Sequence, residues 1–160
     1  MNELSHIDEA GNVRMVDVSA KLATERRATA SAKVRLSSDT IRILKAGETP
    51  KGNPLEIARI AGILAAKKTS DLIPLCHQIN LSKVNVSAEL TDEGLSLTSE
   101  VITNAQTGVE MEALTAVSIA ALTIYDMCKA VQRDIVIEGI MLESKTGGKN
   151  DYTREPSSLK

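Results

Sequence analysis

Aromatic side chains are almost absent from this 160-residue chain, which has two tyrosines and neither phenylalanine nor tryptophan. Without rings on which unpaired bases stack, a single-strand nucleic-acid platform is not expected. Charge argues the same way, because 19 Lys and Arg residues face 21 Asp and Glu residues, and the formal net charge of -2 lacks the basic excess of a general nucleic-acid binder. The core must be aliphatic, and the 42% hydrophobic content suffices for one domain.

Cysteine, histidine and long apolar runs are scarce as well. Cys76 and Cys128 form no CxxC pair, so we expect free thiols. With only His6 and His77 beside them, soft ligands are too few for a closed zinc site, and we expect no structural metal. The amino terminus lacks the pattern of a secretory signal, and no apolar run of membrane-spanning length is evident. These absences predict a cytoplasmic protein without a membrane partner.

Hydrophobic periodicity predicts a single α+β domain over residues 1–149, with an extended arm at about 1–27 and a mobile tail at 150–160. Strands and helices of this number favour a two-layer sandwich of ferredoxin-like arrangement, with an antiparallel sheet packed against helices. In order, the expected elements are a strand at 28–36, a helix at 40–45 capped by Ser38 or Asp39 and stopped by Gly47, a helix from Asn53 to about 67, a hairpin at 84–101, a helix from 109 to about 131, and a strand at 135–142.

The long helix has charged residues at both ends and none between Ala113 and Ile124. Near its exit, Asp126 and Lys129 allow two interpretations: a surface ion pair, or a proton donor with its orienting or proton-accepting partner. Glu112 at the entry lies 14 residues before Asp126, about 21 Å along a helix at roughly 1.5 Å per residue. One small substrate cannot easily reach both, so a pocket that uses both ends would need two chains, which predicts an oligomer.

Lysines flank the Asn53 helix and the Gly147-Gly148 pair. Lys51 precedes the helix start, Lys67 follows its end, and Lys145 lies beside the glycines. Each position alone is routine, because cations are common beside helices and favoured at their C-termini. Together they suggest a polyanionic ligand such as a triphosphate, although the chain has no GxxxxGK[ST] motif and is not a P-loop enzyme.

His77 follows Cys76 in a loop that has no sustained hydrophobic period. Its near-neutral pKa range suits a hydrogen-bond donor or proton shuttle, and the alternative is a buried histidine with satisfied hydrogen bonds. Adjacent side chains seldom point the same way, so a Cys76–His77 catalytic pair is disfavoured.

Ungapped stretches along nearly the whole chain resemble one family, the molybdenum cofactor biosynthesis protein C family of cyclic pyranopterin monophosphate synthases. The stretches are Met15-Val16-Asp17-Val18, Lys51-Gly52, 58–62 (ARIAG), 71–77 (DLIPLCH), 107–114 (TGVEMEAL), 123–129 (TIYDMCK) and 145–149 (KTGGK).

The resemblance implies a ferredoxin-like subunit in a hexamer, a trimer of dimers, with the active site in the dimer interface. It implies a lyase that converts 3',8-cyclo-7,8-dihydro-GTP to cyclic pyranopterin monophosphate and releases pyrophosphate. On the matching positions, Asp126 and Lys129 are the catalytic pair. The implied substrate contacts are Leu75, Cys76, His77, Met111 and Glu112, with Lys51, Lys67 and Lys145 as basic partners.

In that reaction the lysines would stabilise charge that grows on the leaving pyrophosphate. We expect burial and neighbouring lysines to lower the pKa of Lys129, with Asp126 holding it in place. No cofactor is expected, and magnesium would enter with the triphosphate. The alternative from another class is a non-catalytic, small-molecule-binding α+β module that oligomerises through its apolar helix.

Overall fold

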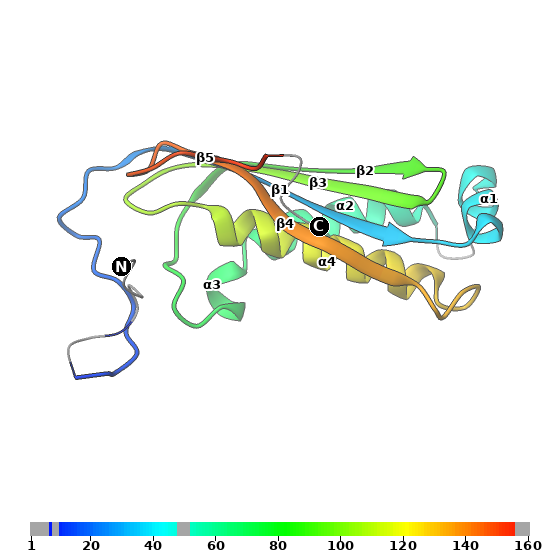
Figure 1. Cartoon of the computed structure of the whole chain (residues 1–160), viewed down its shortest axis with the longest axis horizontal. Helices are drawn as coiled ribbons and strands as arrows, with labels where there is room; N and C mark the ends of the chain where they lie inside the picture. The colour runs from blue at the N-terminus through cyan, green and yellow to red at the C-terminus, as the bar shows by residue number, and fades with distance from the viewer. Residues whose placement is uncertain (1–6, 8–9, 48–51, 156–160) are drawn as a thin grey trace.

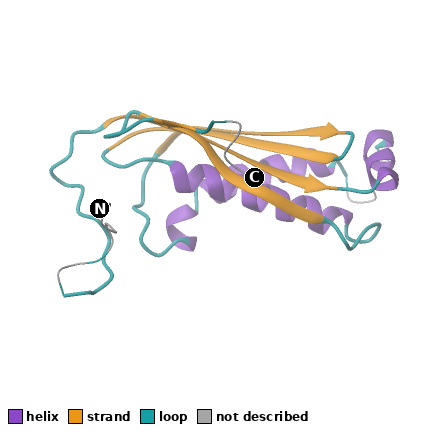
Figure 2. Ribbon diagram, in the orientation of Figure 1, coloured by secondary structure: helices purple, strands orange, loops and turns teal. Residues whose placement is uncertain are grey.

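The computed structural model describes residues 7, 10–47 and 52–155. Their strands form one antiparallel sheet in the order β2-β3-β1-β4-β5, and the long helices α2 and α4 cover one face of it (Figures 1 and 2). This confirms the predicted ferredoxin-like α+β sandwich. The elements are β1 (Thr24–Arg35), α1 (Ser38–Ala46), α2 (Pro54–Ala66), α3 (Thr69–Leu72), β2 (Leu81–Thr91), β3 (Gly94–Ala105), α4 (Glu110–Cys128), β4 (Val136–Thr146) and β5 (Tyr152–Thr153).

The core lies between the sheet and the two long helices and is aliphatic, as the missing aromatics require. Alternate residues of β1 face it, because side chains of a strand alternate between the two faces of a sheet. Small residues let α2 and α4 pack closely: a Cβ on Gly62 would lie 2.8 Å from the carbonyl oxygen of Ala116. The fully buried side chains of α4 are Ala113, Ala116, Val117, Ala120, Ala121 and Ile124.

By length and composition alone, α4 is also apolar enough to cross a membrane. Half of the qualifying stretch is buried inside the protein, where α4 packs against α2 and β1. The core helix of a protein that spans no membrane passes the same test, and α4 has such a position, packed against the sheet and against α2.

The helix ends follow mostly from local signals. Asn53 caps α2 through its side-chain oxygen, which accepts from the amides of Leu55 and Glu56 at 3.1 and 3.4 Å, and Gly47 ends α1 in the left-handed region at φ 69°. The prediction of Ser38 or Asp39 as the cap of α1 is wrong. Ser37 is the cap, and its hydroxyl accepts from the amide of Thr40.

Several boundaries differ from the predicted ones. The hairpin strands β2 and β3 extend beyond the predicted 84–101, to 81 and 105, and β4 continues to Thr146 instead of ending at 142. β1 begins at Thr24, inside the predicted arm, because backbone pairing with β3 continues there although the side chains are polar. α4 ends at Cys128, before the predicted 131. In the predicted tail, Tyr152 and Thr153 form β5 beside β4, and Arg154 Nε donates to the carbonyl of Leu142 at 2.9 Å.

Candidate active site

A cleft lies where the N-terminal end of α4 meets the arm and the loop after α3. Its arm-side cavity has a volume of about 520 Å³. The strand-side cavity, also about 520 Å³, lies against Lys67, α3 and the start of β2. The two cavities share His77 and Glu112 as lining residues. The arm-side cavity brings together six of the predicted substrate contacts: Leu75, Cys76, His77, Met111, Glu112 and Lys145.

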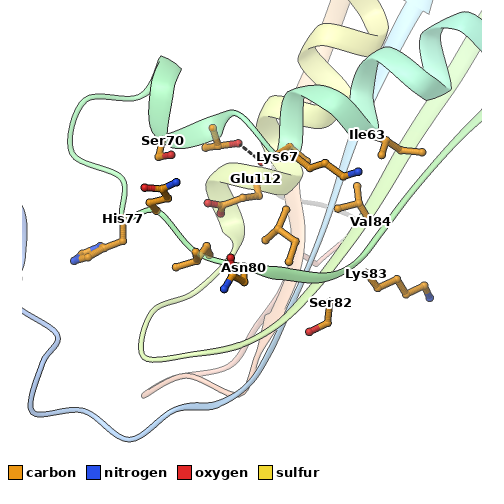
Figure 3. A pocket seen from close by; sticks show the side chains of 14 residues that line it. Ile63, Lys67, Ser70, His77, Asn80, Ser82, Lys83, Val84 and Glu112 are labelled. Atoms are coloured by element: carbon orange, nitrogen blue, oxygen red, sulfur yellow. Dashed lines mark hydrogen bonds between the residues drawn. The ribbon is translucent and has the colours of Figure 1, made fainter.

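Glu112 is the titratable group at the centre of this cleft. It stands in the first turn of α4 and is 5% exposed. Figure 3 shows it among the lining side chains, with His77 to one side and Lys67 to the other. Burial raises the pKa of its carboxyl to about 7, and the neighbouring charge of Glu110 acts in the same direction. A buried carboxyl that titrates near neutral pH inside a cleft is typical of a functional group.

The raised pKa of Glu112 makes the stability of the protein depend on pH. The folded state holds this proton up to about pH 7, whereas the unfolded chain releases it near 4.5, so the free energy of unfolding falls as pH rises between these values. Glu112→Gln carries no such charge. We expect its stability advantage over the wild type to be about 2 kcal/mol larger at pH 8 than at pH 5.

Urea unfolding of both proteins at the two pH values measures this difference. Glu89→Gln, which removes an exposed carboxylate from β2, is the matched control and should show no comparable change. An advantage of Glu112→Gln that is equal at pH 5 and pH 8 would contradict the buried, proton-holding carboxyl.

His77 ties the loop after α3 to the arm. Its Nε2 lies 2.7 Å from the carbonyl oxygen of Val16, and because a carbonyl only accepts, the ring nitrogen donates. Within one chain this hydrogen bond supports the alternative of a satisfied histidine, although the side chain is half-buried, and the functional donor or proton shuttle stays a prediction. Next to it, burial and then the charge of Glu112 raise the pKa of the Cys76 thiol, which disfavours a thiolate nucleophile.

Basic side chains line the cleft on both sides. Lys145 Nζ lies 2.9 Å from Glu110 Oε1, and Lys67 lines the strand-side cavity. An adjoining cavity of about 530 Å³ shares Lys145 with the arm-side cavity and adds Arg26 and Lys149. The predicted basic partner Lys51 lies outside the described residues.

Sequence reasoning missed several lining residues. Lys21 lines both the arm-side and the adjoining cavity, and Asn80 and Ser70 line the strand-side one. They lie in the arm, in the loop before β2 and in the short helix α3, where no periodicity marks a face. Among the residues that the structure describes, no group of three or more His, Cys, Asp and Glu side chains is arranged to hold a metal ion.

Asp126 and Lys129 lie at the other end of α4 (Figure 1). Lys129 Nζ is 2.7 Å from Asp126 Oδ1, and the side chains are 53% and 58% exposed. The expected lowering of the Lys129 pKa is wrong for this chain, because the side chain is not buried and its hydrogen bond to Asp126 raises the pKa. The helix is continuous between Glu112 and this pair, so one chain does not bring them to the same cleft.

The fold and the cleft together define a class, an α+β protein in which two long helices cover one face of an antiparallel sheet and a cleft combines lysines with a buried carboxyl. Residues 15–148 match the MoaC family, and the chain belongs to this family.

Curated relatives share the similarity over almost the whole chain. The chain is 50% identical over 154 residues to "Cyclic pyranopterin monophosphate synthase" of Peptoclostridium acidaminophilum. The matched region covers 96% of this chain and 98% of that protein. The protein of the same name from Chloroflexus aggregans is 51% identical over 161 residues, covering 99% and 98%. "Molybdenum cofactor biosynthesis bifunctional protein" of Chlorobaculum tepidum is 55% identical over 148 residues. The matched region covers 92% of this chain but only 47% of that longer protein.

Proposed function

We propose that this chain is a lyase of molybdenum cofactor biosynthesis, which converts 3',8-cyclo-7,8-dihydro-GTP to cyclic pyranopterin monophosphate and releases pyrophosphate. The observation that carries the proposal is the 50% identity to a cyclic pyranopterin monophosphate synthase over 98% of that protein's length. The cleft supports it, since its cations and buried carboxyl suit a nucleotide-derived substrate with a triphosphate.

The residues divide the chemistry between them. Lys67 and Lys145, with Lys51 as a further expected partner, stabilise the charge that develops on the departing pyrophosphate. Lys129 supplies a proton during rearrangement of the ring system, and Asp126 orients its ammonium group by their hydrogen bond. A lysine side chain is protonated at neutral pH, as a donor must be, and the hydrogen bond to Asp126 raises the pKa of Lys129 further, which favours the charged ammonium form. No cofactor is required in this scheme, and magnesium would arrive only with the triphosphate.

We further propose that the active site forms between two chains of a homodimer, within a hexamer built as a trimer of dimers. The length of α4 supports this, because its two functional ends lie about 21 Å apart at roughly 1.5 Å rise per residue. Large apolar side chains exposed on the outer surface of the helices also support association between copies. They are Ile57, Ile60, Leu64, Leu72 and Leu122. The free thiols Cys76 and Cys128 agree with a reducing, cytoplasmic location.

The direct test supplies the cyclised nucleotide to the purified protein and measures pyrophosphate. We expect many turnovers per chain, with cyclic pyranopterin monophosphate formed in equal amount. A non-catalytic binding module, the alternative from another class, would bind the nucleotide without releasing pyrophosphate, and that result would overturn the proposal.

A further inference from the structure

The helix that carries Lys129 ends without the usual closing residue. Lys129 is the C-cap residue of α4, and its backbone keeps right-handed helical geometry, with φ -60° and ψ -21°. Many helices are closed by a glycine in the left-handed region, as Gly47 closes α1, but no such residue follows Cys128 before β4. Helix ends fray, and the Lys129 side chain is too exposed for packing to hold it. Something else must fix this exit turn.

Gln132 makes side-chain hydrogen bonds that fix the turn. Its Oε1 accepts from the amide of Ser37 at 2.8 Å and from the hydroxyl of Thr40 at 3.0 Å, and its Nε2 donates to Asp134 Oδ1 at 2.9 Å. Thr40 is 1% exposed, and Ser37 caps α1, so the partners of Gln132 belong to a firmly placed helix start. Figure 1 shows α1 and the exit of α4 at the same end of the molecule.

A second contact holds the next residue of the turn. Tyr125 directly precedes Asp126 in α4, and its Oη donates to the carbonyl oxygen of Arg133 at 3.2 Å. The backbone amide of Gln132 also donates to the carbonyl of Cys128 at 3.0 Å. The turn is therefore joined to the last turn of α4 on one side and to α1 on the other.

We propose that Gln132 is a positioning residue for the reaction: by anchoring the exit turn to α1, it aims the ammonium group of Lys129 at the substrate. This inference rests on the proposed function. Gln132 touches no substrate in this scheme and acts through Lys129. A misplacement of a reacting group by about 1 Å can cost roughly 100-fold in rate, so a small loosening of the turn should be visible in catalysis.

Gln132→Met tests the proposal, because methionine has a similar length but cannot replace the amide hydrogen bonds. We expect kcat for pyrophosphate release to fall about 10- to 100-fold with KM nearly unchanged. In a Lys129→Ala background the same substitution should cost little more, because the group that it positions is already missing. Amide hydrogen exchange over residues 129–133 should become faster in Gln132→Met.

Two matched variants separate positioning from stability. Ser37→Ala removes the cap hydroxyl of α1 but leaves the backbone amide that donates to Gln132, so it should lower Tm while keeping kcat. Gln132→Glu combined with Asp134→Asn exchanges donor and acceptor across their hydrogen bond and should recover most of kcat.

The experiments distinguish a failure of the positioning role from a failure of the proposed function. Wild-type kcat in Gln132→Met, or a loss that Ser37→Ala matches at the same fall in Tm, would overturn the positioning role alone. Absence of pyrophosphate release by the wild-type protein would overturn the proposed function, and the positioning role with it.

Discussion

Asp126→Asn and Lys129→Ala should each lower kcat for pyrophosphate release by about 100- to 10,000-fold, the range that a positioned proton donor contributes. The pair forms a close ion pair, yet both side chains are more than half exposed in the single chain. Exposed ion pairs contribute little to stability, so neither substitution should unfold the protein. A large loss of turnover with unchanged Tm and unchanged oligomer size would therefore report chemistry rather than folding. A stopped-flow or coupled pyrophosphate assay measures turnover, thermal unfolding followed by circular dichroism measures Tm, and light scattering measures oligomer size.

The chain contains a matched control for this experiment. Asp39 and Arg42 form another ion pair at i,i+3 spacing on the exposed surface of α1, with 3.8 Å between Arg42 Nη2 and Asp39 Oδ1. Asp39→Asn and Arg42→Ala should keep wild-type turnover. Full activity of Asp126→Asn and Lys129→Ala would show that their pair is surface decoration, the other interpretation that the sequence allows.

Local signals in the sequence were enough to predict most of the fold. Asn53 before Pro54 and Gly47 after α1 mark helix ends by backbone chemistry that does not depend on the rest of the chain. The start of β1 and all of β5 were not predicted, because no local signal in the sequence marks them as strands. Both join the sheet through backbone hydrogen bonds that no side-chain periodicity marks: the start of β1 pairs with the distant end of β3, and the two residues of β5 pair with the end of the preceding strand β4.

The candidate site was predictable in about half of its members and not in its electrostatics. Six residues of the arm-side cavity follow from the resemblance and converge in one chain, whereas Lys21 was missed and Asp126 and Lys129 lie at the other end of α4. The protonation states depend on burial and partners in three dimensions: Glu112, at a helix start that favours a negative charge, instead has its pKa raised to about 7 by burial. Lys129 was expected to have its pKa lowered by burial. Its side chain is exposed instead, and the hydrogen bond to Asp126 raises its pKa.

Mixing two inactive variants should restore activity if the active site is shared between chains. One variant is Asp126→Asn, which disables the exit end of α4, and the other combines His77→Ala with Lys145→Ala, which disables the cleft at its entry. In a symmetric dimer with two equivalent sites, a mixed pair has one site with both defects and one site with none. Random mixing makes half of the pairs mixed, so we expect about a quarter of wild-type activity.

Co-expression of the two variants, followed by the pyrophosphate assay, measures this recovery. The control mixes Asp126→Asn with Lys129→Ala, whose defects lie at the same end of α4, so that no mixed site is intact. Because Glu112 and Asp126 are held apart by one continuous helix, a site within a single chain would have to work with one end only. Recovery in the first mixture and none in the control would place the two ends in one site. Equal, background activity in both mixtures would contradict a site that two chains build together.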